Sequence, residues 1–579
     1  MRFFSAAQYL DTDIVFLFEV EYLGRNYRFS SFPLTLSDGD AEILYEGGLE
    51  DPEFSLELGQ TGEVIATEGS VSMALTFPFN VAKRQQEGRG IDRSKCRLYY
   101  VLSKNGRIQQ TQEQRIGLMQ GVISEPIYGH PDRENGYVEF SVVSDIETND
   151  SSMLKMVSGD VLFLEKAAFS NPPNYPDLPS SIILPKDPDG IIDVLDVHKG
   201  KTAPFVFGNA GQIFGQTGTT TTAGATPAYL IAYENVAPDY NAWYIIAGHD
   251  VTASTVKIHD NQGNSDDNIA VHKYVGSRGY VYSFIVLTAA TPIDRSFVVN
   301  NDIQYWIEWD DGGGYPNVAG EGELTGGGDL IIWSFELLGL RYDRERWNAV
   351  RDHLNEYKFS GYVNDAKIKL FEWVQSNIIA YLPVSVANGP DGLFPIIDYR
   401  IDSIHVRARA RLEESPEFRR VSPVEPILSD ITNDLTVRFG PRGNGSDSDV
   451  YMSFATCTYQ QQYTTDARFE IVSPYAIVSF QQYGTKPKVI ELDFVYDMET
   501  AGRIAANHIK TNALPQKKIS YRAAFRFGYL ELGDVIEITD SDLGLNEYRA
   551  QICGKRYELK SWIYDILISE NPIDNNRTL

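Results

Sequence analysis

The chain has 579 residues, of which 43% are hydrophobic and 22% charged, and its formal net charge is −28. This length exceeds what one hydrophobic core supports, so several domains of ordinary soluble composition are expected. The negative charge argues against a groove for nucleic acid, because phosphate backbones bind basic surfaces. Such a charge favours solubility first, and an acidic lumen or a basic partner second.

The cysteines and the apolar runs argue against a disulfide-rich, zinc-binding, secreted or membrane-spanning protein. Cys96, Cys457 and Cys553 are far apart and odd in number, and no CxxC pair occurs, so we expect neither a disulfide framework nor structural zinc. The chain is therefore expected to fold in a reducing cytoplasm. We also expect no signal peptide and no membrane-spanning segment, because no window reaches the ~20 apolar residues that a transmembrane helix needs.

Residues 1–168 are expected to form a β-barrel-like or sandwich-like domain. The period-two alternation of Phe54–Leu58 and Ser70–Phe77 is typical of half-buried strands. Asn105-Gly106 predicts a two-residue hairpin, because both central residues of a type I′ turn need positive φ. Further strands are expected at Ile14–Val20, Arg28–Phe32, Arg97–Ser103, Leu118–Ile123 and Tyr137–Val143.

The next two segments are defined by proline and glycine. Residues 169–209 contain a proline-rich stretch, which predicts an extended linker and connecting segment. Residues 210–330 are predicted to be an inserted β-domain, with the glycines at 312–314 and 326–328 serving as joints. Its strands are expected at Ala228–Tyr233, Trp243–Ala247, Thr255–His259, Tyr280–Val286 and Ile303–Trp309, with a solvated hairpin tip at Asp260–Asn268.

Residues 331–395 carry the main helical periodicity. One helix is predicted to bury Trp347, Val350, Leu354 and Tyr357 and to end at Gly361. A second helix, capped by Asn364 or Asp365, is predicted to bury Phe371, Val374 and Ile378, and Asn388–Gly392 is a turn cluster.

Residues 396–579 are expected to form a C-terminal β-rich domain with one short helix. That helix spans about 498–512, and Asp497 is placed to cap it. The run from Leu530 to Asp534, Leu-Glu-Leu-Gly-Asp, predicts a turn between two strands.

No segment has the spacing of an established catalytic, cofactor or metal site. His249, His259 and His272 lie near Asp250, Asp260, Asp266 and Asp267, and imidazole with carboxylate is a reasonable ligand set. The intervals between the histidines match no metal motif, however. We therefore predict no catalytic residue, no cofactor and no metal.

Three tryptophans of the inserted domain are the candidate contact residues. Trp243, Trp306 and Trp309 are candidates to line a surface for glycan or a protein partner. The alternative is ordinary aromatic packing, since aromatic residues favour strands in any case. The neighbouring Asp310 and Asp311 do not suggest a glycosidase, because adjacent strand residues point to opposite faces and cannot flank one bond.

Three segments together resemble the baseplate hub, or tail-tip, proteins of long-tailed bacteriophages. They are Pro204–Gly208 after the proline linker, Asp391–Pro395 after the predicted helix pair, and the helix-to-strand run from Asp497 to Ile538. The resemblance covers the chain outside 210–330 and consists of an order of elements and turns rather than a fixed motif.

The resemblance implies a mainly β (α+β), multi-domain fold with two barrel-like hub domains, formed by 1–168 and 396–579. It also implies a non-enzymatic homotrimeric ring at the virion tail tip, assembled after folding in the host cytoplasm. Its partners would be the tail tube or a distal tail protein and other baseplate and fibre proteins, and phage DNA would pass without specific binding. The alternative hypothesis is a glycan-directed tail protein, either a cell-wall hydrolase or a carbohydrate-binding module, with 210–330 as its active part.

Overall fold

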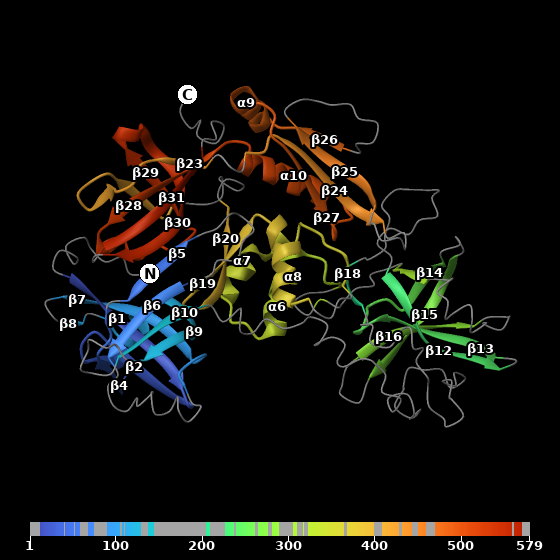
Figure 1. Ribbon diagram of the computed structural model, residues 1–579, viewed down its shortest axis with the longest axis horizontal. Helices are drawn as coiled ribbons and strands as arrows, with labels where there is room; N and C mark the ends of the chain where they lie inside the picture. The colour runs from blue at the N-terminus through green and yellow to red at the C-terminus, as the bar shows by residue number, and fades with distance from the viewer. Residues whose placement is uncertain are drawn as a thin grey trace.

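The computed structural model of the chain is mainly β, with several sheets and five α-helices among the described residues (Figure 1). The structure describes residues 12–39, 41–50, 52–57, 68–74, 90–104, 107–108, 110–128, 137–143, 204–208, 226–236, 239–260, 265–275, 281–288, 305–309, 317, 322–363, 368–398, 408–427, 431–442, 450–458, 469–558 and 561–569.

The N-terminal unit is a sheet built mostly from antiparallel neighbours. From one border to the other the strands pair in the order β3, β4, β2, β1, β7, β9, β10, β6 and β5, and only β2 with β4 is parallel. Lys104 pairs with Arg107, which confirms the two-residue hairpin predicted from Asn105-Gly106. The strands are β1 (Thr12–Tyr22), β2 (Arg25–Ser30), β3 (Leu34–Asp38), β4 (Ala41–Gly47), β5 (Glu53–Glu57), β6 (Glu68–Ala74), β7 (Lys95–Lys104), β8 (Arg107–Ile108), β9 (Ile116–Tyr128) and β10 (Tyr137–Val143), with the 3-10 helix η2 (Gln112–Gln114) between β8 and β9.

The C-terminal unit continues the same sheet. Strand β5 pairs on one side with β6 and on the other with β30, in the register Phe54 with Tyr557 and Glu57 with Gly554. The first and last parts of the chain therefore form one 17-stranded sheet. The C-terminal elements are β21 (Ala410–Glu413), β22 (Phe418–Arg420), β23 (Glu425–Ile427), β28 (Gln516–Ala523), η7 (Phe525–Phe527), β29 (Val535–Asp540), η8 (Ser541–Leu543), β30 (Leu545–Glu558) and β31 (Ser561–Ser569).

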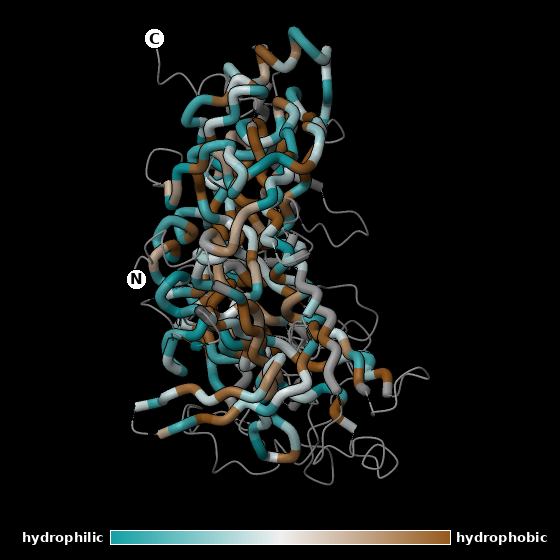
Figure 2. The backbone as a smooth tube through the Cα atoms, turned by 90° about the vertical axis from the view of Figure 1, so that its left-hand side faces the viewer, coloured by the Kyte–Doolittle hydropathy of each residue, from teal (hydrophilic) through white to brown (hydrophobic). Residues whose placement is uncertain are grey.

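One hydrophobic cluster fills both units. It contains Phe16 and Phe18 of β1 together with Tyr521, Trp562 and other residues of the last strands. The rings of Phe16 and Tyr557 are 4.9 Å apart, and those of Tyr100 and Trp562 are 5.8 Å apart. In the side view the molecule is narrow, and hydrophobic and hydrophilic residues alternate along many of its segments (Figure 2).

Residues 226–308 contain a closed, six-stranded antiparallel barrel at the other end of the molecule (Figure 1). Strand β15 was not predicted, because Ser265–Asn268 is hydrophilic and was expected in the hairpin tip. The structure pairs His259 with Ser265, so that predicted tip is shorter and the polar residues belong to the strand. The strands, in barrel order, are β12 (Thr226–Val236), β13 (Asp239–Ala247), β16 (Val281–Thr288), β15 (Ser265–Val275), β14 (Thr255–Asp260) and β17 (Tyr305–Glu308).

The helical segment lies between these units and corrects three local predictions. Gly326–Gly328 is no joint, because Gly326 is the N-cap of α6 and a Cβ on Gly328 would lie only 2.8 Å from the carbonyl oxygen of Arg351 on α7. Helix α7 ends at Leu354, and Gly361 instead begins a strand. Helix α8 has Lys369 as its N-cap rather than Asn364 or Asp365. The elements are α6 (Gly327–Leu338), α7 (Arg344–Leu354), β18 (Gly361–Val363), α8 (Leu370–Asn377), η6 (Ile379–Tyr381), β19 (Val384–Gly389) and β20 (Gly392–Ile397).

A small α/β unit is inserted into the C-terminal region. Its four strands are ordered β26, β25, β24, β27, and the buried face of β24 packs into the same cluster as α6, α7 and α8. Asp497 caps α10 as predicted, accepting from the backbone N–H groups of Glu499 and Thr500. The region contains a second α-helix, α9, so the expectation of one helix was wrong. The elements are β24 (Asp434–Arg442), β25 (Val450–Thr458), β26 (Phe469–Val472), α9 (Pro474–Tyr483), β27 (Pro487–Leu492) and α10 (Met498–Asn512).

Within the described residues, none of the helices has both the length and the apolar character that a membrane crossing requires.

The β5–β30 pairing makes a prediction for Ser55, an exposed residue that faces Arg556 on one side and Glu68 on the other. Because β5 has neighbours on both sides, Ser55→Pro removes a ladder hydrogen bond and is expected to cost roughly 1–3 kcal/mol of unfolding free energy. Chemical denaturation followed by tryptophan fluorescence measures the loss. Ser55→Thr is the matched control and is expected to change little, and equal behaviour of the two variants would contradict the role of this strand.

Candidate functional site

The predicted Leu-Gly-Asp turn lies where the C-terminal unit meets the helical segment. It connects η7 to β29, and Gly533 adopts a φ of +85°, a conformation that favours glycine. The Asp534 carboxylate accepts a 2.7 Å hydrogen bond from the Glu531 N–H, which closes the turn. The Gly533 N–H donates to the Ile552 carbonyl at 2.8 Å, so the turn is also fixed to β30.

Hairpin β19–β20 packs directly on this turn. A Cβ on Gly533 would lie 2.6 Å from Cγ2 of Ile396, so only glycine permits the approach. The Gln551 side chain donates to the carbonyl oxygens of both Ile397 and Gly533, each at 3.0 Å. The Gln551 side chain of β30 therefore bonds the turn and β20 at once.

Charged side chains from two other segments bind the turn. Arg409, just before β21, lies 2.8 Å from Asp534, and Arg346 of α7 donates to Glu531 at 2.7 Å. Burial raises the pKa of the Asp534 carboxyl, although the neighbouring Arg409 acts in the opposite direction. The carboxylates of the turn are thus used to hold Arg409 and Arg346.

Lys555 of β30 is the buried cation of the junction. Its ammonium donates to the carbonyl oxygens of Gly528 and Leu530 at 2.8 and 2.9 Å and lies 4.6 Å from the centre of the Trp562 ring. Burial lowers its pKa to about 8, while Glu531 and Asp534 act to raise it. Lys555 and Asn388 line a cavity of about 40 Å³, large enough for water but not for a substrate.

The barrel is attached to the helical segment through a second contact region, the joint, which is built around β11 (Phe205–Phe207). This strand pairs with β18, and its side chains alternate between two cores. Phe205 and Phe207 pack with the helices, whereas Val206 packs in the barrel. The joint therefore buries both faces of one short strand.

His249 holds this second joint and is not free to bind metal. Its Nε2 accepts the Val206 N–H at 2.9 Å, and its Nδ1 lies 2.6 Å from the Asp250 carbonyl oxygen, to which it donates. Both ring nitrogens are therefore occupied. His272 lies on β15 with its ring 5.5 Å from that of Phe284. The side chains of His259 and Asp260 lie outside the described residues, so the proposed histidine–carboxylate cluster gains no support from His249.

The tryptophan prediction is corrected at one position. Trp309 is fully buried in the barrel core and donates through Nε1 to the Thr226 hydroxyl at 3.0 Å, so it does not contribute to a surface. Its burial was not evident from sequence because a strand end has no fixed facing. Trp243 and Trp306 lie on β13 and β17, and their side chains lie outside the described residues.

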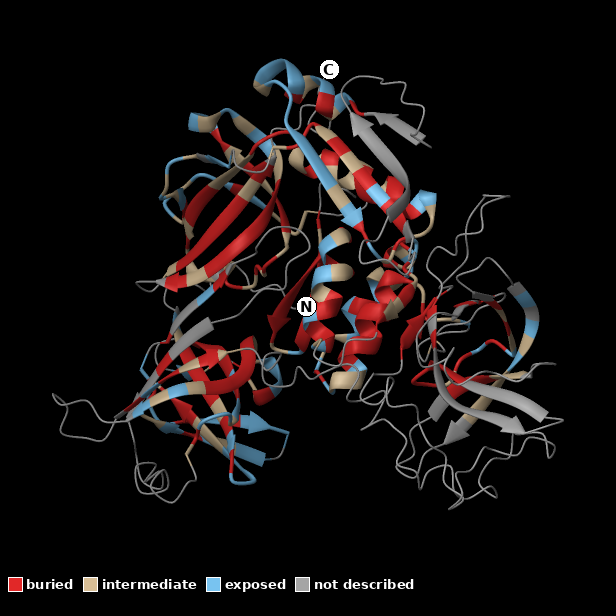
Figure 3. Ribbon diagram, turned by 45° about the vertical axis from the view of Figure 1, so that its right-hand side comes forward, coloured by how far each residue is buried: buried red, intermediate tan, exposed pale blue. Residues whose placement is uncertain are grey.

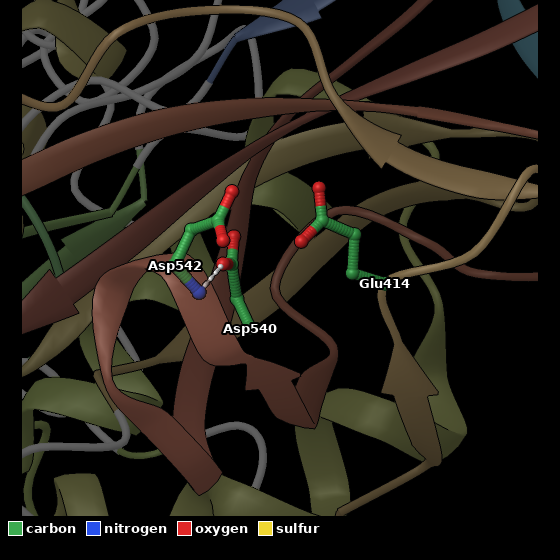
Figure 4. Close-up of side chains that lie close together, drawn as sticks. All are labelled: Glu414, Asp540 and Asp542. Carbon is green, nitrogen blue, oxygen red and sulfur yellow. Dashed lines mark hydrogen bonds between the residues drawn. The ribbon is translucent and has the colours of Figure 1, made fainter.

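Glu414, Asp540 and Asp542 form a carboxylate group that sequence analysis did not identify (Figure 4). Their oxygens lie within 4.8 Å of one another. Desolvation, followed by the charges of Asp540 and Asp542, raises the pKa of Glu414. Asp540 is fully buried and accepts from the Tyr521 hydroxyl at 2.9 Å and from the Asp542 and Leu543 N–H groups at 3.1 and 3.2 Å, so it caps η8.

The residues missed by sequence analysis are Lys555, Arg409, Arg346 and His249 in its structural role. The segment around Lys555 gave no signal either, because Ala550–Tyr557 also contains Gln551 and Arg556. Arg346 and Arg409 bind carboxylates 185 and 125 residues away, and His249 accepts the Val206 N–H across 43 residues. Within the described part of the chain, the hydrogen bonds and ion pairs given above connect the turn to α7, the segment before β21, and β30.

Comparisons with known proteins give structural matches only; no family model and no curated protein matches the chain. The tail protein from Neisseria meningitidis MC58 is 9% identical with a TM-score of 0.36, over 96% of this chain and 97% of that chain. The 43 kDa tail protein of prophage MuSo2 from Shewanella oneidensis is 8% identical with a TM-score of 0.35, over 96% and 99%. A chain of the native gene transfer agent virion is 9% identical with a TM-score of 0.37, over 64% and 85%. TM-scores of this size do not establish a common fold.

The Leu-Gly-Asp junction predicts the effect of Gly533→Ala. The substitution introduces left-handed backbone strain and a clash with Ile396, so it is expected to lower the unfolding free energy by roughly 2–4 kcal/mol. Gly544→Ala is the matched control, because Gly544 also has a positive φ, +67°, but no atom within 4 Å of its Cβ. Chemical denaturation of the full chain compares them, and equal losses would show that the contact with Ile396 is unimportant.

The His249 joint predicts a pH dependence. Burial lowers the pKa of His249 to about 4, below the ordinary 6.5, so the native state binds this proton less readily than the unfolded state does. The joint is therefore fully stable above pH ~6.5 and loses up to roughly 3 kcal/mol as the pH falls to about 4. Asp250 and Lys273, paired at 2.5 Å, are the nearby charges.

The measurement is thermal unfolding across this pH range, comparing the wild type with His249→Gln. Glutamine can accept the Val206 N–H but does not titrate, so the variant is expected to have a flatter pH profile between pH 4 and 6.5. Identical slopes for the two proteins would assign the pH dependence to other groups, most simply the carboxylates.

Proposed function

We propose that this chain is a structural hub protein of a phage tail tip. Three copies form a ring that joins the tail tube to distal tip proteins and lets genomic DNA pass during ejection. The protein acts in the virion and catalyses no reaction. In this proposal the two barrel-like hub domains are the N-terminal unit and the C-terminal unit.

The observation that carries the proposal is that the Leu-Gly-Asp run binds several distant segments of the chain. This run is part of the segment on which the resemblance to tail-tip proteins rests, and its carboxylates bind Arg346 and Arg409. Its glycine admits Ile396, and its backbone binds β30. These groups fix the turn to α7, to the segment before β21 and to β30, which supports an assembly role rather than chemistry on a substrate.

The charge supports the passage of DNA. With a net charge of −28, a channel bounded by copies of this chain repels phosphates, so DNA would slide without being held. The barrel at the end of the molecule is the part proposed to contact neighbouring baseplate or fibre proteins (Figure 1). Trp309 is buried, so it is not available to contact a glycan on the surface of the barrel.

The ring proposal predicts the native mass of the full chain. Light scattering is expected to give three times the 65.0 kDa chain mass, and electron microscopy is expected to show a ring with a central channel. The trimer should persist on dilution, because obligate interfaces bury more than ~2,000 Å².

Two further outcomes decide between the hypotheses. A monomer at every concentration tested would contradict the ring. Hydrolysis of purified cell wall by the full chain, abolished by substitution of Asp260 but retained in a control substituted at Asp38, would instead favour the glycan-directed alternative.

A further inference from the structure

Strand β27 is the border strand of the four-stranded sheet. Within the described residues it pairs only with β24, so its second edge has no strand beside it. Figure 3 shows β27 as a largely exposed strand, and five of its six residues are not buried. Exposed strand edges carry unpaired backbone groups and readily add another strand. We call the open edge of β27, with Lys486 and Lys488 on one side of the sheet and Val489 on the other, the β27 face.

Apolar side chains are exposed on and beside this face. Val489 is 53% exposed, and the preceding helix α9 exposes Ile477 and Phe480 by 37% and 38%. Helix α9 contains no charged residue along Pro474–Tyr483, which is unusual for an exposed helix of a strongly charged chain. Exposed apolar groups next to an open strand edge are typical of a protein–protein contact.

The β27 face is positively charged, whereas the chain as a whole is negatively charged. Lys486 and Lys488 are exposed, and neither has an ion-pair partner among the described residues. The carboxylate nearest along the strand, Glu491, is bound to Arg438 at 2.9 Å. Lys488 also lies close enough to His508 that its charge contributes to lowering the pKa of that imidazole, after burial.

We propose that the β27 face docks against an acidic surface of a second copy of this chain. The inference rests on the proposed ring and names one of its contacts. Charge complementarity carries it: the copy has a net charge of −28, whereas the face presents two lysines. A symmetric β27–β27 pair would bring the lysines of both copies together, so the contact joins two different surfaces. Contacts of this head-to-tail kind generate a closed ring when the rotation between copies closes, as three-fold symmetry requires.

The test is the self-association of full-length variants with equal net charge. Lys486→Glu with Lys488→Glu reverses the face, and Lys358→Glu with Lys369→Glu reverses two exposed lysines near the helical segment. Both double variants are equally acidic, so general repulsion between copies is matched. Sedimentation over a concentration series is expected to give a dissociation constant at least about tenfold higher for the β27 variant than for the control.

A second pair of variants tests the apolar part. Val489→Glu is expected to weaken self-association, whereas Leu44→Glu, at a position 60% exposed in the N-terminal unit, is expected to leave it unchanged. Circular dichroism and thermal unfolding establish that each variant is folded.

The outcomes separate this inference from the proposed function. If wild type and all variants form the same trimer, the β27 face is not in the interface and the inference fails while the ring stands. If the wild type is monomeric throughout, the ring fails and the inference fails with it. If the β27 variant trimerises but no longer joins assembled tails, the face binds a different tail protein, and docking of a second copy is overturned.

Discussion

The pairing of β5 with β30 is the constraint on which the rest of the molecule depends. It joins residues near the start of the chain to residues near its end, and it allows one hydrophobic cluster to fill both units. The chain between β5 and β30 therefore leaves this sheet and returns to it. The helical segment, the α/β unit and the barrel all belong to that intervening part of the chain (Figure 1). Closing so long a loop costs entropy that only extensive burial offsets.

The junction around the Leu-Gly-Asp turn is where the helical segment is held against the C-terminal unit. Hairpin β19–β20 contacts the turn through Ile396 and accepts a hydrogen bond from Gln551 of β30 at the Ile397 carbonyl. Asn388 of the same hairpin donates to the Gln120 carbonyl at 2.6 Å. The hairpin thus touches both the C-terminal and the N-terminal unit. Lys555 fills the interior of the junction with a charge that is bonded to carbonyl oxygens rather than to a carboxylate. A buried cation tolerates this only when its donors are satisfied, so the site depends on accurate backbone positions.

The described contacts that attach the barrel differ in kind from those between the units of the main sheet. Strand β11 contributes aromatic rings to the helical core, with Phe205 stacked 4.9 Å from Trp333, and a valine to the barrel core. A neutral histidine accepts its central N–H. Among the described residues, a short strand and one titratable side chain therefore help to hold the orientation of the barrel, whereas the N- and C-terminal units share a continuous sheet.

The sequence by itself determined the local elements whose signal lies within one turn or one strand. Alternation located most of the strands, Asn105-Gly106 located a hairpin, and Asp497 located the start of α10. It also identified the Leu-Gly-Asp turn, although not its partners. The tertiary structure alone decided that Gly326–Gly328 packs into a helix, that Trp309 is buried and that His249 joins two cores. These outcomes depend on residues distant in sequence, and a local pattern of hydrophobicity carries no information about which distant backbone will approach.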